Sequence, residues 1–210
     1  MTEVRAEGKA RAERLQISRW VATAFVLGTF TLAVLNVLLI HQNRELKKTT
    51  ITAKQSKYLS PGDTVPPLRG LDAEGQQIKI DYASQGSSDH RKTIVLVFSP
   101  KCGWCDVNLP NWHAILDSLD YSRYRVVAVS TDQDGLAKYL SENNLSEITL
   151  VQQPAPQDRK EYKMNTTPMT LVVGNGGVIE KVWAGAFWPH QQKEVENFFG
   201  VELPGISEAA

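Results

Sequence analysis

Two apolar runs constrain the fold of this chain more than any other feature. Residues 93–99 are TIVLVFS and residues 124–131 are YRVVAVST, both rich in β-branched side chains and almost without a polar face. A strand of this kind is stable only where both of its faces are buried. We therefore expect a central sheet that is covered by helices on both sides.

The surrounding segments alternate between helical and extended patterns. Helices are predicted at residues 102–119, 135–144, 156–164 and 190–199, and further strands at 147–152, 169–174 and 178–185. The last two strands are joined by Asn-Gly-Gly, a strong hairpin signal, and residues 61–81 form an extended or hairpin segment at the start of the domain. This order predicts an α/β three-layer sandwich with a central mixed sheet.

A third apolar run lies near the N-terminus. Residues 20–40, WVATAFVLGTFTLAVLNVLLI, contain no charged side chain. About 20 apolar residues cross a bilayer as a helix, which satisfies its own backbone groups. A cleaved signal peptide is the main alternative, but its apolar part would be shorter, about 7–15 residues, and a small-residue cleavage site would follow. We therefore expect one uncleaved transmembrane helix.

The chain thus divides into five predicted parts. They are an N-terminal arm (1–19), the transmembrane anchor (20–40), a polar tether (41–57), a folded domain (58–204) and a tail (205–210). Lys and Arg residues flank the anchor on both sides, so the positive-inside rule does not select an orientation. The formal net charge of +0 gives no indication of a nucleic-acid partner.

The chain contains only two cysteines, Cys102 and Cys105, in the segment SPKCGWCDVNLP. Cys102 lies at the start of a predicted helix, where unpaired N–H groups favour an anion, and Lys101 adds positive potential. A thiolate is the attacking species in disulfide exchange. Cys105, one turn further on, would be more buried and able to attack a mixed disulfide on Cys102. The pair predicts a redox-active disulfide, with no other cofactor and no metal.

Two other uses of the cysteines have less support. A structural zinc site needs a second ligand pair, whereas the histidines are scattered along the chain at His41, His90, His113 and His190. A purely structural disulfide would close too short a loop to constrain the unfolded chain much. A copper site that combines both thiols with His190 remains an alternative, although a histidine at a helix start is more often a surface residue.

A second motif, NTTPMTLVV, precedes the strand at 169–174. Pro168 removes a backbone donor there, so it is either a cis proline or an ordinary trans proline at the start of an edge strand. Beside the cysteine helix, the backbone of Thr167 would bind an extended substrate segment. Trp104, between the cysteines, would offer a peptide an apolar face, or would instead pack under the adjacent loop.

Together, the cysteine pair, Pro110, the Thr167-Pro168 loop, the Gly-rich hairpin and the last helix resemble the thioredoxin superfamily. The proline-rich leading segment and the anchor narrow the resemblance to TlpA/ResA-like thiol–disulfide oxidoreductases tethered in bacterial envelopes. The resemblance covers about residues 60–201. It implies a thioredoxin-like fold on a single-pass protein of the cell inner membrane, with the N-terminus cytoplasmic and the domain periplasmic. It also implies exported protein substrates with cysteine pairs, such as apocytochrome, and a membrane thiol electron donor.

The chain departs from these relatives at the acids that accept the proton of the second thiol. Leu96 stands where thioredoxins carry an aspartate, and Asn108 where some ResA-like proteins carry a glutamate. Asp106 is nearby, but we expect it to be a solvated residue of the helix's first turn. The acceptor for Cys105 is therefore left open. We expect a reductase; an oxidase, an isomerase and a Sco-like copper-delivery module are the alternatives.

Overall fold

The computed structural model describes residues 27–28, 30–32, 34–39, 57–82 and 89–206. The chain separates into two compact units, Met1–Gln55 and Ser56–Ala210. The predicted arm (1–19) lies outside the described residues, and so do the tether up to residue 56 and the tail from residue 207.

In the first unit, every described residue is helical, and the apolar side chains there are exposed, with Leu27 at 67% and Phe30 at 69%. Two polar side chains bond to the carbonyl one turn earlier: Thr31 Oγ1 to Leu27 O at 2.8 Å, and Asn36 Nδ2 to Leu32 O at 3.0 Å. Part of the predicted anchor 20–40 is not described. Within the described parts of the chain, no helix is long and apolar enough to cross a membrane.

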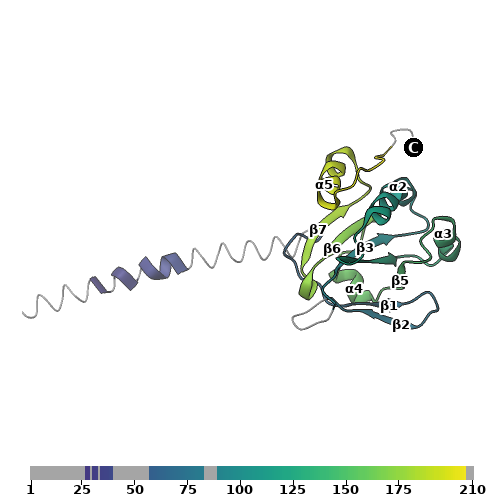
Figure 1. Cartoon of the computed structure of the whole chain (residues 1–210). Helices are drawn as coiled ribbons and strands as arrows, with labels where there is room; N and C mark the ends of the chain where they lie inside the picture. The colour runs from purple at the N-terminus through teal and green to yellow at the C-terminus, as the bar shows by residue number, and fades with distance from the viewer. Residues whose placement is uncertain (1–26, 29, 33, 40–56, 83–88, 207–210) are drawn as a thin grey trace, which may run out of the picture. The chain divides into compact units, whose positions relative to one another are not determined.

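The second unit contains a seven-stranded sheet (Figure 1). The strands are β1 (Leu68–Leu71), β2 (Gln77–Ile80), β3 (Lys92–Phe98), β4 (Tyr124–Ser130), β5 (Thr149–Gln152), β6 (Met169–Val173) and β7 (Ile179–Ala184). Their order across the sheet is β2-β1-β5-β4-β3-β6-β7. The segment at 61–81 thus does form a hairpin, β1–β2, which pairs in register from Leu68↔Ile80 to Leu71↔Gln77.

The sheet is mixed, as predicted. Strand β4 runs parallel to both β3 and β5, whereas β6 is antiparallel to β3 and to β7. The short helix η1 (Asn175–Gly177) makes the predicted turn between β6 and β7, with Gly176 and Gly177 both at positive φ. The hairpin β1–β2 extends the sheet through a single antiparallel pairing, Leu71↔Gln152. The sequence did not predict that contact.

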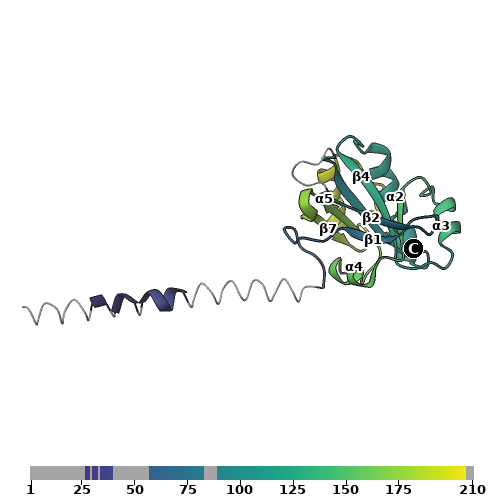
Figure 2. The same ribbon diagram turned by 90° about the horizontal axis from the view of Figure 1, so that it is seen from below.

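Helices cover both faces of the sheet, which confirms the three-layer arrangement (Figures 1 and 2). They are α2 (Gly103–Ser118), α3 (Leu136–Glu142), α4 (Pro156–Glu161) and α5 (Pro189–Phe199). Side chains from α2, α3 and α5 pack together in one apolar cluster on one face. The other face is covered by the chain before β1 and by the residues around the end of α4, including Tyr162 and Met164.

Strand β3, which contains one of the two long apolar runs, is buried on both of its faces. Ile94, Leu96 and Phe98 belong to the cluster on the α2 side. Val95 and Val97 alternate with them and belong to the cluster on the opposite face. All five are at most 3% exposed. Successive side chains of a strand point to opposite faces, so this run forms the centre of both cores and holds α2 in place at its end.

Candidate active site

The two cysteines lie where β3 gives way to α2. After Phe98 the chain makes one turn, in which Cys102 N donates to Ser99 O at 3.0 Å. Cys102 is then the N-cap of α2, with extended backbone, and its carbonyl accepts from Cys105 N at 2.8 Å. The first N–H groups of a helix lack intrahelical acceptors and favour negative charge. The predicted position of Cys102 at the start of a helix is thereby confirmed.

The two sulfurs have different surroundings. Both cysteines are free thiols; Cys102 is half-buried, whereas Cys105 is 0% exposed. Burial raises the pKa of Cys105 far above the usual range of a thiol, and the hydrogen bond with Cys102 raises it further. Cys105 is therefore protonated at neutral pH, while Cys102 is the thiol that a solute can reach.

The Thr167-Pro168 loop lies against the first sulfur. The Thr167–Pro168 peptide bond is cis, which decides between the two alternatives that the sequence left open for Pro168. Cys102 Sγ donates to Thr167 O across 3.4 Å. The Pro168 carbonyl accepts from Gly185 N at 2.8 Å, which ties the loop to the end of β7. The cysteine helix and the proline loop, which are remote in sequence, thus form one site.

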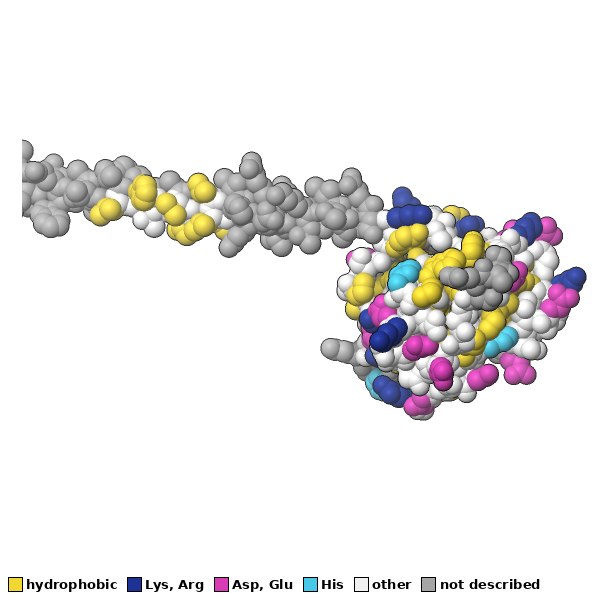
Figure 3. Space-filling view, turned by 90° about the horizontal axis from the view of Figure 1, so that it is seen from above, with side chains coloured by type: hydrophobic (Ala, Val, Ile, Leu, Met, Phe, Trp, Pro, Cys, Tyr) yellow, Lys and Arg dark blue, Asp and Glu magenta, His cyan; other side chains and the backbone are white. Residues whose placement is uncertain are grey.

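Trp104 is exposed, which agrees with the first of the two alternatives that the sequence left open for it. Its side chain is 48% exposed. Its ring lies 5.1 Å, centroid to centroid, from that of Trp188, which is the N-cap residue of α5 and 38% exposed. Hydrophobic side chains gather on the side of the domain that carries α2 and α5 (Figure 3). The two tryptophans therefore form an exposed aromatic pair, and one member, Trp104, lies between the two cysteines in sequence.

Sequence reasoning did not assign Trp188 to this site. In the sequence it only precedes a predicted helix. Its place in the site follows from its contact with Trp104 in the structure. An aromatic residue at a helix N-cap, where Ser, Thr, Asp or Asn is preferred, is the one signal that could have drawn attention to it.

Lys101 does not act on Cys102 alone. Its Nζ lies 2.9 Å from Asp134 Oδ2 and 3.3 Å from Asp132 Oδ2. These two carboxylates offset the positive potential that we predicted for the sulfur. The same contacts join the cysteine turn to the segment that leads into α3, so Lys101 has a positioning contact that the sequence did not reveal.

We considered Leu96 and Asn108 as positions for an acid near Cys105, and both side chains are buried and uncharged. Leu96 is 3% exposed. Asn108 is 0% exposed, and its Oδ1 accepts from Phe187 N at 2.9 Å and from Asn111 Nδ2 at 3.3 Å. Its Nδ2 has no hydrogen-bond partner among the described residues. Asn108 therefore joins α2 to the segment before α5 and supplies no carboxylate for Cys105.

Two other sequence candidates are exposed side chains at helix starts. His190 is exposed in the first turn of α5, and Asp106 is exposed in the first turn of α2. Among the residues that the structure describes, no group of three or more His, Cys, Asp or Glu side chains is arranged to hold a metal ion. The alternative copper site, in which His190 joins both thiols, is therefore not formed among these residues.

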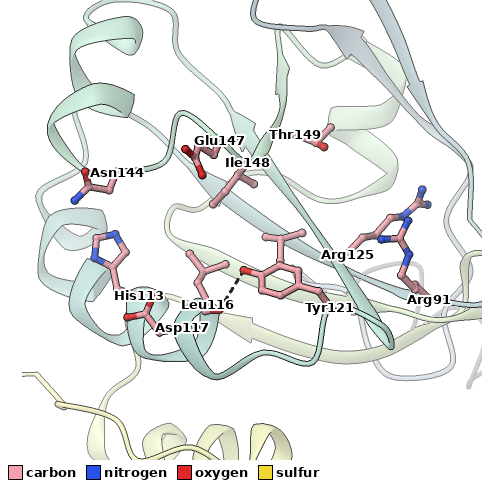
Figure 4. Close-up of a pocket in the computed structure, with 11 residues that line it drawn as sticks. Arg91, His113, Leu116, Asp117, Tyr121, Arg125, Asn144, Glu147, Ile148 and Thr149 are labelled. Carbon is pink, nitrogen blue, oxygen red and sulfur yellow. Dashed lines mark hydrogen bonds between the residues drawn. The ribbon is translucent and has the colours of Figure 1, made fainter.

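A separate hollow of about 740 Å³ lies at the other end of β4, around Tyr121 and Arg125 (Figure 4). The Tyr121 hydroxyl donates to Leu116 O at 3.1 Å there. Its charged side chains have both signs, as with Arg91 and Glu147. None of the predicted site residues lines it, so it is not part of the cysteine site.

Comparison with known proteins identifies the fold. No protein-family model and no curated protein matches this chain. Among solved structures, it resembles the thioredoxin domain of a thiol-disulfide oxidoreductase from Bacteroides vulgatus, with a TM-score of 0.53 and 18% identity over 67% of this chain and 99% of that one. A protein assigned as thiol:disulfide interchange protein DsbE from Chlorobium tepidum gives a TM-score of 0.53 and 20% identity, and the match covers 66% of this chain and 94% of that one. A third, assigned as a protein disulfide isomerase from Bacteroides thetaiotaomicron, gives a TM-score of 0.51 and 13% identity. That match covers 67% of this chain and 86% of the other. The domain therefore has the thioredoxin-like fold that the sequence predicted.

Proposed function

We propose that this protein is a thiol–disulfide oxidoreductase that works through Cys102 and Cys105. One observation carries the proposal: the N-cap residue of a helix carries a reachable thiol, and a fully buried thiol lies one turn behind it. A buried second thiol that stays protonated does not compete for the substrate, yet it is placed to attack a bond formed on the first sulfur. The solved structures of similar fold include proteins described as oxidoreductases of this kind.

The reaction proceeds in two exchanges. The Cys102 thiolate attacks one sulfur of a client disulfide, and the other client sulfur leaves as a thiolate. Cys105, once deprotonated, attacks Cys102 Sγ and releases the second client sulfur. The client disulfide has then gained two electrons and two protons, and the protein holds a Cys102–Cys105 disulfide.

The surroundings of Cys102 suit a polypeptide client. The Thr167 carbonyl, which the Cys102 thiol occupies in the reduced protein, becomes available once the sulfur is bonded to a client. An extended segment can pair with the backbone of Thr167. The exposed rings of Trp104 and Trp188 offer apolar contact beside it.

The proposed direction is reduction, on a protein anchored in the cell inner membrane by residues 20–40. The N-terminus would be cytoplasmic and the domain periplasmic, with exported proteins as clients and a membrane thiol donor that re-reduces Cys102–Cys105. The exposed apolar side chains of the described helix suit a lipid environment. Its polar residues Thr31 and Asn36 are bonded within the helix, as an apolar surrounding requires.

The activity is tested by reduction of insulin disulfides with dithiothreitol as the electron source. The wild-type protein should accelerate reduction, and Cys102→Ser should abolish the acceleration. Titration of the reduced protein with Cu(I) serves as the competing test. Tight stoichiometric binding of Cu(I) without insulin turnover would replace the proposal with a copper-delivery role.

The anchor is tested separately by fractionation of cells that express the full-length chain. The chain should remain in the membrane pellet after alkaline carbonate extraction, and a truncated chain that starts at Ser56 should be released. Recovery of the full-length chain in the soluble fraction would contradict the anchor and leave the thiol chemistry untouched.

A further inference from the structure

A second hollow, of about 750 Å³, lies beside the cysteine site. We call it the α4 hollow. The loops that follow β4 and β5 line it, together with α4 and the chain that leads to the Thr167-Pro168 loop. Its polar and charged lining residues include Asp132, Gln133, Gln153, Arg159, Lys160 and Asn165. None of these side chains takes part in the exchange proposed for the two cysteines.

Two sets of contacts place the α4 hollow next to Cys102. On one side, the Oδ2 atom of Asp132 lies 3.3 Å from the Nζ atom of Lys101, the residue before Cys102. On the other side, Asn165 lines the hollow two residues before Thr167, whose carbonyl accepts from Cys102 Sγ across 3.4 Å. The hollow therefore adjoins the site at both the cysteine turn and the proline loop.

Hydrogen bonds fix the two loops that line the hollow. Thr131 donates to Phe98 O from its backbone N at 2.9 Å and from its Oγ1 at 3.1 Å. Phe98 is the last residue of β3, so this loop is held against the start of the cysteine turn. Gln153 Nε2 donates to Gln133 Oε1 at 3.0 Å and joins the second loop to the first. A hollow that is already formed loses little freedom when it binds a ligand.

The charged side chains that line the α4 hollow leave an excess of positive charge. Among the described residues that line it, Asp132 is the one acid, and it is paired with Lys101. Arg159 and Lys160 lie in the last turn of α4, and both are exposed. Neither forms an ion pair with another described residue. Two cations are therefore available to a ligand.

The acids of α4 itself are engaged elsewhere. Asp158 is 0% exposed and accepts from the backbone N of Arg69 at 2.7 Å and from its guanidinium. Glu161 accepts a hydrogen bond from Gln157 Nε2, one turn earlier on the exposed side of the helix. Neither acid lines the hollow. The cations of α4 thus face the hollow without an acid of their own helix beside them.

We propose that the α4 hollow binds an acidic segment of the client, so that the protein prefers disulfides flanked by aspartate or glutamate. This inference rests on the proposed function, because it assigns a class of client to the same site. A client bonded to Cys102 and paired with the backbone of Thr167 extends along the residues before Thr167, toward Asn165. Since a strand advances about 3.3 Å per residue, side chains a few residues from the client cysteine reach the hollow.

The two cations contribute to this recognition in different ways. The planar guanidinium of Arg159 can bind both oxygens of one carboxylate through parallel hydrogen bonds. The ammonium group of Lys160 acts as a mobile point charge that attracts a second acid. Both side chains are exposed, so each contact should be modest in strength and should weaken as salt is added.

The test compares three synthetic peptides on the full-length reduced chain in detergent. Each peptide has one cysteine, blocked as a disulfide with thionitrobenzoate. Aspartates flank the cysteine on both sides in the first peptide, asparagines in the second and lysines in the third. The measured quantity is the second-order rate constant for release of coloured thionitrobenzoate. Each rate constant is divided by that of the same peptide with dithiothreitol, which corrects for intrinsic reactivity.

The wild-type protein should react about 3–10-fold faster with the aspartate peptide than with the asparagine peptide, as expected for exposed charge pairs. The lysine peptide should react slowest. The preference should shrink in about 1 M salt, where the screening length is about 3 Å.

Arg159→Gln and Lys160→Gln should each lower the ratio of the aspartate rate to the asparagine rate, and the double variant should bring it close to one. Arg159→Glu combined with Lys160→Glu should favour the lysine peptide instead. Arg123→Gln is the matched control, because it removes an exposed cation just before β4, at the opposite end of that strand from the hollow. It should keep the wild-type ratio.

Equal corrected rates with all three peptides would overturn the acidic preference and leave the thiol exchange in place. A wild-type ratio in the double glutamine variant, or an equal loss of preference in Arg123→Gln, would also overturn it. Absence of thionitrobenzoate release with every peptide would instead overturn the proposed function. Circular dichroism establishes that each variant is folded, and the salt dependence tests the wild-type protein without any substitution.

Discussion

The thiol of Cys102 donates a hydrogen bond to the carbonyl of Thr167, which lies 65 positions later in the chain and 3.4 Å from the sulfur. This contact joins the cysteine helix to the proline loop and defines the surface on which a client disulfide would lie. Cys102 is half-buried at this surface, whereas Cys105 is fully buried behind it.

Selective alkylation is the first expected consequence. In the reduced folded protein at pH 7, iodoacetamide should modify Cys102 at least about tenfold faster than Cys105, because only Cys102 is both reachable and placed at a helix N-terminus. Peptide mapping after timed quenching measures both rates. Equal rates at the two cysteines would remove the distinction between attacking and resolving thiols.

The stability of the reduced protein should fall as pH rises above about 8.5, the usual pKa of an unfolded thiol. The raised pKa of Cys105 keeps its proton in the folded state, whereas the unfolded chain loses it. The unfolded state then binds fewer protons, so the free energy of unfolding decreases by up to about 1.4 kcal/mol per pH unit.

Chemical denaturation between pH 7 and pH 10 measures this slope. Cys105→Ala should be much less sensitive to pH over that window, since it lacks the buried thiol. Above about pH 10, the tyrosines also titrate, so the comparison stops there. An identical slope in the wild-type and Cys105→Ala proteins would contradict the claim that the buried Cys105 thiol causes the pH dependence.

The exposed pair of Trp104 and Trp188 should affect peptide clients and not small disulfides. Either substitution to Ala should lower kcat/KM for a peptide disulfide by about 3–10-fold, as expected for the loss of one aromatic contact. Reduction of a small aromatic disulfide and alkylation of Cys102 should change little. Tyr121→Ala, an exposed aromatic residue in the separate hollow, is the control. Equal losses with both kinds of substrate would indicate damage to the thiol site.

Asn108 should be a structural residue. Its Oδ1 accepts the buried backbone N–H of Phe187 at 2.9 Å, so Asn108→Ala leaves that donor unpaired and should cost about 1–3 kcal/mol of stability. Asn165→Ala, on an exposed side chain, should change stability by less than about 0.5 kcal/mol. Denaturant unfolding measures both variants. A stable Asn108→Ala protein would show that this bond contributes little.

Much of the fold could be predicted because its information is local. The alternation of Val95 and Leu96 between two cores follows from an unbroken apolar strand. The turn glycines Gly176 and Gly177 adopt the positive φ that their hairpin needs. The pairing Leu71↔Gln152 could not be predicted, because the pattern of a strand indicates its buried faces and not which distant strand lies beside it.

The site follows the same division. Cys102, Cys105 and Pro168 can be recognised in the sequence by residue type and spacing, and the structure brings them together. Their side-chain partners cannot be recognised in this way. Trp188 joins the site only through its tertiary contact with Trp104, and Lys101 forms ion pairs with carboxylates of another loop. Sequence order carries no signal for contacts of this kind, which depend on how separate elements pack.

The most direct measurement of the central claim is the capture of the first exchange product. Cys105→Ser should react with a peptide disulfide and hold the peptide as a stable mixed disulfide that mass spectrometry locates on Cys102. The wild-type protein should release the peptide, and Cys102→Ser should capture none. Failure of Cys105→Ser to retain any peptide, or retention on Cys105 in the Cys102→Ser protein at a similar rate, would contradict the account.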